Sequence, residues 1–434
     1  MQWNTHYTDR LTTAAEAVKH ILSGDRVVTA HACAEPAILI EAMVANASQY
    51  RDVEIVHMVP MGAARYCGEG MEGSFRHNAL FAGGPTRSAI SNGRADFTPV
   101  FFSQVPRLLR TVLPVDVALI QVSPPDEHGY CSFGVSVDYT KPAAECARTV
   151  IAQVNPQMPR TLGDSAIHVT DIDHFVEAEM PVIELPRPVI GSVEAAIGRN
   201  CATLVEDGDT LQLGIGAIPD AVLKELHGKS DLGVHSEMLS DGILDLIESG
   251  VVTNRLKTLH QGHCVVTFLM GSRRLYDFVD DNPMIYMAPV DYVNDPRVIA
   301  QNDNLVSINS CVQVDLIGQV VSSSVGAREI SGIGGQADFV RGAGMSKGGR
   351  SIIAIPSTAA KGAVSKIVPF LDEGASVSTG RCDVDYIVTE YGIAELWGRT
   401  LRERAERLIA IAHPDFRPEL TAAFDARFRS PALV

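Results

Sequence analysis

The sequence lacks the features that mark membrane or secreted proteins. No stretch reaches about 18 uninterrupted apolar residues, the length that a membrane-spanning helix needs. The start, MQWNTHYTDRL, has no basic segment followed by an apolar run, so no secretory signal is expected. These absences predict a soluble, cytoplasmic protein without a membrane partner.

An excess of positive charge is also missing. The chain has 36 Lys and Arg against 52 Asp and Glu, which gives a formal charge of −16. This balance argues against nucleic acid or an anionic membrane surface as the main partner, because both attract cationic proteins. An anionic small molecule is compatible with it, since a local basic pocket can hold one.

The eight cysteines form no recognisable pattern. There is no C-x-x-C pair, no His/Cys cluster at zinc spacing and no H-E-x-x-H, so no metal is expected. Scattered cysteines in a chain of this length fit reduced thiols better than a disulfide framework. They are Cys33, Cys67, Cys131, Cys146, Cys201, Cys264, Cys311 and Cys382.

The chain does have enough apolar residues for more than one domain. It has 434 residues, 46% of them hydrophobic, which favours two domains. Apolar strands at 27–30, 53–59, 115–122 and 150–154 alternate with helical patterns, such as the one at 9–23. This alternation predicts an α/β fold with mainly parallel sheets.

The second half of the chain repeats the opening of the first. Gly24-Asp25 precedes a strand, a loop of small residues, Pro36 and a helix. Gly208-Asp209 precedes the same succession, with Pro219 in the place of Pro36. The repeat predicts two similar open α/β domains, and a cleft between such domains is a favoured place for an active site.

The boundary between the two domains is predicted from composition. Proline and charged residues become frequent over 171–188, which we interpret as a linker. The predicted domains are therefore residues 1–188 and residues 189–434.

Two glycine-rich loops are candidates for anion binding. Gly214-Ile215-Gly216 follows a predicted strand and precedes a helix, where backbone N–H groups can bind phosphate. The dinucleotide fingerprint would place a third glycine at Pro219, which disfavours an NAD-dependent oxidoreductase. An ordinary turn explains this loop equally well. Gly332-Ile333-Gly334-Gly335 has three glycines in four residues and could bind phosphate or a developing oxyanion.

Glu237 is distinguished by its position. The stretch His235-Ser236-Glu237-Met238 follows a predicted strand at 231–234 and precedes a helical pattern at 243–249. Chemistry in α/β proteins collects just beyond strand ends. From position alone this carboxylate could be a base, a metal ligand or a nucleophile, and the missing metal spacing weakens the second role.

Six segments in the second half of the chain carry a resemblance to one enzyme family, and that resemblance extends over nearly the whole chain. They are HSEMLSDGILDLIESGVVTN (235–254), LGIGAIPDAVL (213–223), PVDYVNDPRVIAQNDNLVSINSCVQVDLIGQV (289–320), SGIGGQADFVRGA (331–343), IAIPSTAAKGAVSKIVP (353–369) and DVDYIVTEYGIAEL (383–396). The sequence resembles family I CoA-transferases of the acetyl-CoA hydrolase/transferase family. Within that family it is most similar to 4-hydroxybutyrate and butyryl-CoA:acetate CoA-transferases.

The resemblance implies a role for each matching residue. Glu237 matches the family's catalytic glutamate, Gly335 is expected to donate its N–H to an oxyanion, and Asn294 lies where relatives place a polar group beside the glutamate. These residues and the CoA-binding loops fall in the second predicted domain. CoA-binding positions are implied at Gln212, Leu213, Gly214, Ile215, Gly216, Ala217, Ile218, Gly332, Gly334, Gly335 and Lys361.

The implied reaction moves CoA between an acyl-CoA and a short-chain carboxylic acid, acetate with butyrate or 4-hydroxybutyrate. It would proceed by a ping-pong mechanism through a glutamyl-CoA thioester. CoA is then a substrate, and no tightly bound cofactor is expected. Two alternatives stay open, an acyl-CoA hydrolase using the same glutamate and a non-catalytic metabolite-binding protein.

The resemblance also bears on assembly, and the loops after the first strands bear on the acyl pocket. Relatives suggest a homodimer or a higher homo-oligomer. The loops His31–Pro36 and Met58–Met61, together with Gln104, are expected to shape the acyl pocket.

Overall fold

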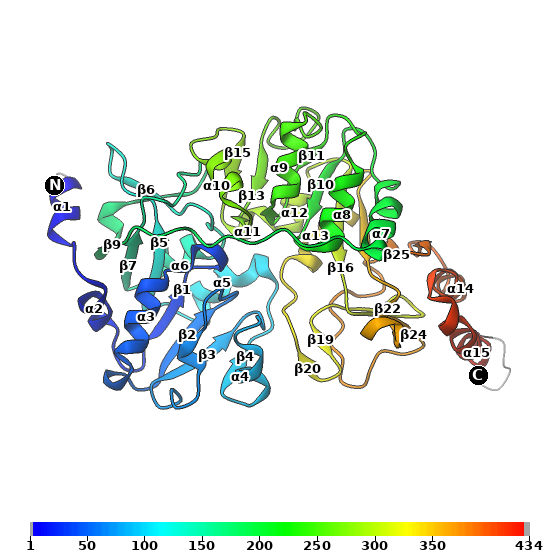
Figure 1. Cartoon of the computed structure of the whole chain (residues 1–434), viewed down its shortest axis with the longest axis horizontal. Coiled ribbons are helices and arrows are strands. Elements are labelled where there is room, and N and C mark those ends of the chain that lie inside the picture. The colour runs from blue at the N-terminus through cyan, green and yellow to red at the C-terminus, as the bar shows by residue number, and fades with distance from the viewer. Residues whose placement is uncertain (1–2, 429–434) are drawn as a thin grey trace. The chain divides into compact units, whose positions relative to one another are not determined.

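The computed structural model describes residues 3–428, which form two compact units (Figure 1). Within the described residues, the first unit comprises 3–186, Glu237–Asp241 and His263–Asn294; the second comprises Arg187–Ser236, Gly242–Gly262 and 295–428. The predicted linear division at residue 188 therefore differs from these units, which are interleaved along the chain. Glu237 and Asn294, expected in the second domain, both lie in the first unit.

A seven-stranded sheet is the centre of the first unit, and every strand pairing in it is parallel. All six residues of β5 are buried, as continuous apolar runs are in parallel sheets. In sheet order the strands are β4 (Ala95–Phe97), β3 (Phe75–Ala79), β2 (Val53–His57), β1 (Arg26–Thr29), β5 (Val117–Val122), β7 (Thr149–Val154) and β9 (His174–Glu177).

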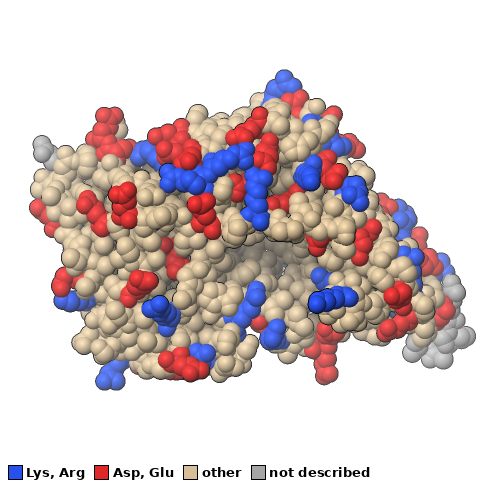
Figure 2. Space-filling view, in the orientation of Figure 1, with Lys and Arg blue, Asp and Glu red and all other residues tan. Residues whose placement is uncertain are grey.

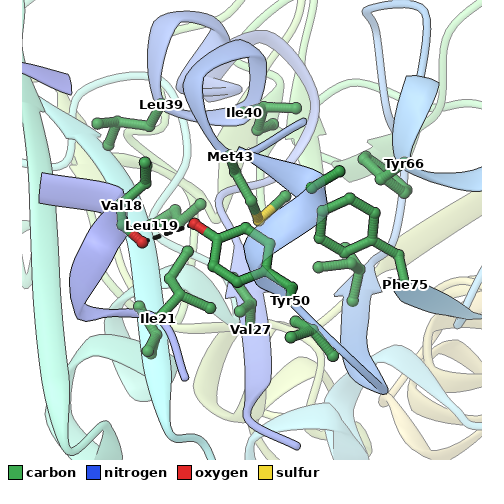
Figure 3. Close-up of a cluster of buried hydrophobic side chains, with 14 of the residues drawn as sticks. Val18, Ile21, Val27, Leu39, Ile40, Met43, Tyr50, Tyr66, Phe75 and Leu119 are labelled. Atoms are coloured by element: carbon green, nitrogen blue, oxygen red, sulfur yellow. Dashed lines mark hydrogen bonds between the residues drawn. The ribbon is translucent and has the colours of Figure 1, made fainter. Parts of the chain in front are cut away.

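Helix α3 (Ala37–Ala45) packs on this sheet through a dense apolar cluster (Figure 3). Leu39 and Met43 of the helix meet Val27 of β1 in that cluster. Tyr50 fills the same core and donates its hydroxyl hydrogen bond to the carbonyl of Val18 at 2.7 Å. This packing fixes the loop between β1 and α3, which contains His31 and Glu35.

The helix predicted over 9–23 was wrong in its extent. The structure has α1 (Trp3–Asp9) and then α2 (Ala14–Ala17), with an isolated β-bridge from Leu11 to Phe175 between them. The Thr13 side chain caps α2 by accepting a hydrogen bond from the backbone N–H of Glu16 at 3.3 Å. A capping threonine starts a new helix without changing the apolar spacing, so the periodicity concealed the break.

The predicted linker was also wrong in part. Residues 174–177 form β9, the last strand of the first sheet, and the chain has no regular structure from 178 to 191. Within His174-Phe175-Val176-Glu177 the adjacent Phe175 and Val176 are both buried, and two apolar residues are too short a run to be recognised as a strand. The prolines and charges around it masked that short run.

Buried His77 makes the stability of this sheet depend on pH. Its side chain lies in β3 with no solvent exposure, its Nδ1 is 3.0 Å from the carbonyl of Ile55, and burial lowers its pKa to about 4. The unfolded chain, with a histidine pKa near 6.5, therefore binds a proton first as the pH falls. Stability supplied by neutral His77 is present above pH 6.5 and is lost as the pH falls towards 4.

As the pH falls from 7 to 4, the unfolding free energy of the wild type should decrease. The decrease should be about 3 kcal/mol smaller in His77→Asn, which lacks the titrating imidazole. Urea unfolding at several pH values measures this difference, and the asparagine can keep a donor towards Ile55. Parallel pH dependences in the two proteins would show that His77 is not the titrating group.

The second unit has a six-stranded sheet that is parallel except at its last pairing, β25 with β26. In sheet order the strands are β11 (Gly233–Val234), β10 (Thr210–Leu213), β16 (Leu305–Ser310), β21 (Arg350–Ala354), β25 (Tyr386–Thr389) and β26 (Gly392–Glu395). The α/β fold with mainly parallel sheets, predicted from the alternating pattern, is confirmed.

The internal repeat is visible in the turns that open the two sheets. Gly24 and Gly208 both have left-handed backbone, with φ of 84° and 81°. The N–H of Gly24 donates to the carbonyl of Arg51, and that of Gly208 donates to the carbonyl of Ser230, both at 2.9 Å. Each glycine thereby joins the start of one strand to the turn before the next strand, β2 in one unit and β11 in the other.

The aspartates that follow these glycines also have matching contacts. Asp25 accepts from the N–H of Leu22 at 2.8 Å and pairs with Arg148. Asp209 accepts from the N–H of Glu206 at 2.6 Å and pairs with Arg350. The two units thus share a local design as well as a sheet type.

The remaining elements are helices and short strands, and these strands pair in two- and three-stranded sheets. The helices are α4 (Arg87–Ser91), α5 (Val105–Thr111), α6 (Thr140–Cys146), α7 (Ser192–Ala202), α8 (Ala217–Glu225), α9 (Asp241–Glu248), α10 (Arg273–Val279), α11 (Val290–Val293), α12 (Pro296–Ile299), α13 (Gln336–Met345), α14 (Leu401–Ile411) and α15 (Arg417–Phe428). Within residues 3–428, no helix is both long and apolar enough to cross a bilayer. Acidic and basic side chains are interspersed over the face drawn in Figure 2.

Candidate active site

Glu237 lies between two very short strands. β11 ends at Val234, and β12 (Met238–Leu239) begins directly after Glu237. β12 pairs in parallel with β14 (Phe268–Leu269), and the carbonyl of Glu237 accepts a hydrogen bond from the N–H of Thr267 at 3.0 Å. The glutamate backbone is therefore held by a neighbouring strand, and its side chain is only partly buried.

Asn294 contacts the carboxylate of Glu237 directly. Its Nδ2 donates a hydrogen bond to Oε2 of Glu237 at 2.8 Å. Asn294 is fully buried and follows α11, where its backbone N–H donates to the carbonyl of Val290 at 3.0 Å. A side chain anchored in this way orients the carboxylate, because neither its backbone nor its amide can move without breaking a bond.

A closed ring of hydrogen bonds joins these two residues. The N–H of Thr267 donates to the Glu237 carbonyl, and the N–H of Asp138 donates to the Thr267 carbonyl at 3.2 Å. The N–H of Val290 donates to the Asp138 carbonyl at 3.1 Å, and Asn294 then completes the circuit back to Glu237. The sequence carries no signal for Thr267, Asp138 or Val290, because main-chain bonds between distant segments leave no pattern of residue types.

Asp138 is the most heavily bonded member of this ring. Its buried carboxylate accepts hydrogen bonds from the N–H of Tyr139 at 2.6 Å and that of Thr140 at 3.1 Å, and from the Ser136 hydroxyl. His31 Nδ1 lies 2.9 Å from the same carboxylate. The ring is thus tied to the loop that follows β1, one of the loops expected to shape the acyl pocket.

The second loop expected at the acyl pocket is tied to the first. Oε2 of Glu35 accepts hydrogen bonds from the N–H of Met61 at 2.7 Å and from that of Gly62 at 3.0 Å. A Cβ added to Gly62 would lie 2.4 Å from Oε1 of Glu35, so a larger residue at this position would require the Glu35 carboxylate to shift. Gln104, also expected there, is exposed at the end of a 3₁₀ turn (Phe102–Gln104).

The first glycine loop joins the end of β10 to the start of α8, the strand-to-helix position at which anions can bind. Gly216 is the N-cap of α8, and its φ of 115° requires glycine. A Cβ added to Gly214 would meet nothing within 4 Å, so open space lies over that backbone. Ile215 is exposed, and Ala217 and Ile218 form the first turn of the helix. The N-terminus of a nine-residue helix favours anions.

Gln212 and Leu213, implied as CoA-binding residues, are buried in β10. Oε1 of Gln212 accepts hydrogen bonds from the Ser307 hydroxyl at 2.7 Å and from Nδ2 of Asn309 at 3.0 Å. The Leu213 carbonyl accepts a hydrogen bond from the Ser236 hydroxyl at 3.1 Å. Both residues therefore support the end of the strand before the loop.

The second glycine loop and Lys361 also have unusual backbone. Gly335 is the buried N-cap of α13, and Gly334 before it has a φ of 55°. Gly332 precedes this pair and is buried. Ala360, Lys361 and Gly362 form a run of three left-handed residues, with φ of 49°, 58° and 92°. Strained non-glycine residues of this kind cluster at functional sites.

No group of three or more His, Cys, Asp or Glu side chains suited to a metal ion exists within residues 3–428. The chemistry that the site offers is that of an oriented carboxylate. A carboxylate fixed by an amide donor can act as a nucleophile, and the same donor can stabilise an oxyanion formed at the carboxyl carbon.

Family models match both ends of the chain. Residues 1–186 match the acetyl-CoA hydrolase/transferase N-terminal domain, and residues 271–424 match the C-terminal domain of the same family. The resemblance noted from the sequence segments is thereby confirmed.

Individual relatives cover nearly the full length. The chain is 62% identical to a 4-hydroxybutyrate coenzyme A transferase of Clostridium kluyveri over 99% of this chain and 100% of the relative. A crystal structure of a 4-hydroxybutyrate CoA-transferase from Porphyromonas gingivalis has a TM-score of 0.86 at 46% identity, covering 98% of this chain and 100% of that one. An acetyl-CoA hydrolase of Kluyveromyces lactis matches less well, at 33% identity over 51% of this chain and 42% of the hydrolase.

Proposed function

The chain belongs to the acetyl-CoA hydrolase/transferase family, and on that premise we propose that it is a CoA-transferase with Glu237 as its nucleophile. It moves CoA between an acyl-CoA and a short-chain carboxylate, acetate with 4-hydroxybutyrate or butyrate. The observation that carries the proposal is the hydrogen bond from Asn294 to Glu237, since it orients the one carboxylate that the family resemblance singles out.

The first half-reaction transfers CoA to the enzyme. The Glu237 carboxylate attacks the thioester carbonyl, and the tetrahedral intermediate expels CoA thiolate, which leaves an acyl-glutamyl anhydride. The thiolate then attacks the Glu237 carboxyl carbon and expels the acyl group as a free carboxylate. The product is a glutamyl-CoA thioester, and the acceptor carboxylate reverses these steps.

Each attack creates an oxyanion that needs a donor. Asn294 Nδ2 is hydrogen-bonded to Oε2 of Glu237, so it can serve the oxyanion that forms on the glutamyl carbon. We propose that the N–H of Gly335 donates a hydrogen bond to the oxyanion that forms on the substrate carbonyl. The loops containing Gly214 to Ile218 and Lys361 are proposed to bind CoA, which keeps the thiol from being lost between steps.

Acceptor dependence separates a transferase from a hydrolase. Acetyl-CoA loss should be fast with 4-hydroxybutyrate or butyrate and slow with water alone. A panel of acetate, propionate, butyrate and 4-hydroxybutyrate as acceptors would identify the acyl group. Fast turnover without any carboxylate would replace the proposal by the acyl-CoA hydrolase.

A cytoplasmic location, the absence of a tightly bound cofactor and a homo-oligomeric state stay predictions. Sedimentation of the purified protein tests the oligomeric state.

A covalent intermediate predicts inactivation that depends on substrate. Hydroxylamine attacks thioesters and borohydride reduces them, so either reagent should inactivate the enzyme only after acyl-CoA is added. We expect loss of more than nine-tenths of the activity and a mass change on the peptide that contains Glu237. Equal inactivation without acyl-CoA would argue against a glutamyl thioester.

A further inference from the structure

The strand that leads into Glu237 has an unusual outer edge. β11 is the edge strand of the second sheet, and two side chains bond to its last residue. The N–H of Val234 donates to Oδ1 of Asn254 at 2.8 Å, and Nζ of Lys257 donates to the carbonyl of Val234 at 2.7 Å. Val234, Asn254 and Lys257 are all buried, with exposed fractions of 0%, 0% and 4%.

The segment that supplies these side chains is itself fastened to β11. The N–H groups of Thr253 and Asn254 both donate to the carbonyl of Leu232 at 3.0 Å. Asn254 has a left-handed φ of 57°, and its carbonyl accepts a hydrogen bond from the N–H of Gly262 at 2.9 Å. This strained conformation is one that asparagine tolerates better than most residues, and it accompanies the bond to Val234.

The aliphatic stem of Lys257 lies directly on the strand. A Cβ added to Gly233 would be 2.4 Å from Cγ of Lys257, although Gly233 does not have a left-handed backbone. Glycine is therefore required there for contact rather than for conformation. The absence of a side chain lets the lysine stem cross the strand and reach the carbonyl beyond it.

The inner edge of the same segment is held by β10. The N–H of His235 donates to the carbonyl of Leu211 at 3.1 Å, and the Ser236 hydroxyl donates to the carbonyl of Leu213. Val234 is thus bonded by side chains on its outer edge, and the two residues after it are bonded by the neighbouring strand. Glu237 is the next residue in the chain.

Burying an ammonium group is costly. The carbonyl at a strand edge does not require one, because a backbone N–H or a water molecule could donate the same hydrogen bond. We propose that Lys257 and Asn254 are positioning residues, which fix the end of β11 and so set the place from which the Glu237 side chain starts. This inference rests on the CoA-transferase reaction proposed above. Small displacements of a nucleophile can lower the rate about 100-fold.

The test compares Lys257→Met with Lys257→Arg, and uses Lys19→Met as the matched control on an exposed lysine. Rates are measured well below the unfolding temperature and divided by the folded fraction. We expect Lys257→Met to lower kcat about 10- to 100-fold with KM for acyl-CoA within about 3-fold, since positioning rather than binding is lost. Lys257→Arg should recover part of kcat, and Lys19→Met should match the wild type.

Hydrogen exchange provides a readout that does not depend on activity. In Lys257→Met, amides of the peptide 232–239 should exchange at least about 10-fold faster than in the wild type, while β5 should be unchanged. A kcat per folded molecule equal to that of Lys19→Met, or unchanged exchange, would overturn the positioning role. If the wild type transfers no CoA, the proposed function fails, and the exchange measurement decides the positioning alone.

Discussion

Glu237→Gln should lower CoA transfer by at least about 10⁴-fold, because removal of a covalent nucleophile costs this much or more in other enzymes. The amide has nearly the same shape and can still accept the hydrogen bond from Asn294, so the fold should be unchanged. CoA binding, measured by calorimetry, should stay within about 3-fold of the wild type. The loss would therefore be in chemistry and not in affinity.

The matched control is Glu248→Gln, which makes the same change on an exposed residue at the end of α9. This variant should keep wild-type activity. A Glu237→Gln enzyme with more than about one per cent of the wild-type rate would contradict the nucleophile assignment. If the wild type itself had no transfer activity to lose, the non-catalytic binding protein would become the better account.

Asn294→Ala should lower kcat about 10²- to 10³-fold, the usual cost of losing one oxyanion donor. The variant removes the donor at 2.8 Å from Oε2 of Glu237 and leaves that carboxylate less well oriented. Asn294→Asp should be at least as damaging at neutral pH, because it places a second carboxylate against the first and the two repel. Steady-state kinetics and CoA titration separate these effects from binding.

An exposed asparagine supplies the control. Asn92→Ala removes an amide from the C-terminal end of α4 and should leave kcat unchanged. Since Asn294 is fully buried, its variants should also be compared by thermal unfolding at equal concentration. A kcat for Asn294→Ala within about 5-fold of the wild type would show that the backbone bond between Glu237 and Thr267 orients the glutamate without the Asn294 side chain.

The position of Glu237 could be predicted because it depends on strand ends. The apolar run before it and the helical pattern after it are local signals, and they place the residue where parallel α/β proteins carry chemistry. The repeat of Gly24-Asp25 in Gly208-Asp209 was predictable for the same reason. Each pair makes the same turn, and that turn requires a glycine with a left-handed backbone.

The surroundings of Glu237 could not be predicted in this way. β12 and β14 have two residues each, too few for any alternation to be seen. Thr267 and Asp138 contribute main-chain atoms, which every residue type has. Only the family resemblance singled out Asn294, and the structure then supplied the reason, a hydrogen bond that no spacing rule contains.

The interleaving of the two units has a consequence for the order of biosynthesis. A ribosome delivers the chain from its N-terminus, and domains fold as their residues emerge. All seven strands of the first sheet are available once residue 177 has been made. The ring that holds Glu237 cannot close until Asn294 emerges, when β10 and β11 are the only two of the six strands of the second sheet that have been synthesised. A nascent chain that stops in the connection after β9 therefore carries a nearly complete scaffold with neither nucleophile nor donor, and the capacity to react with acyl-CoA arises late.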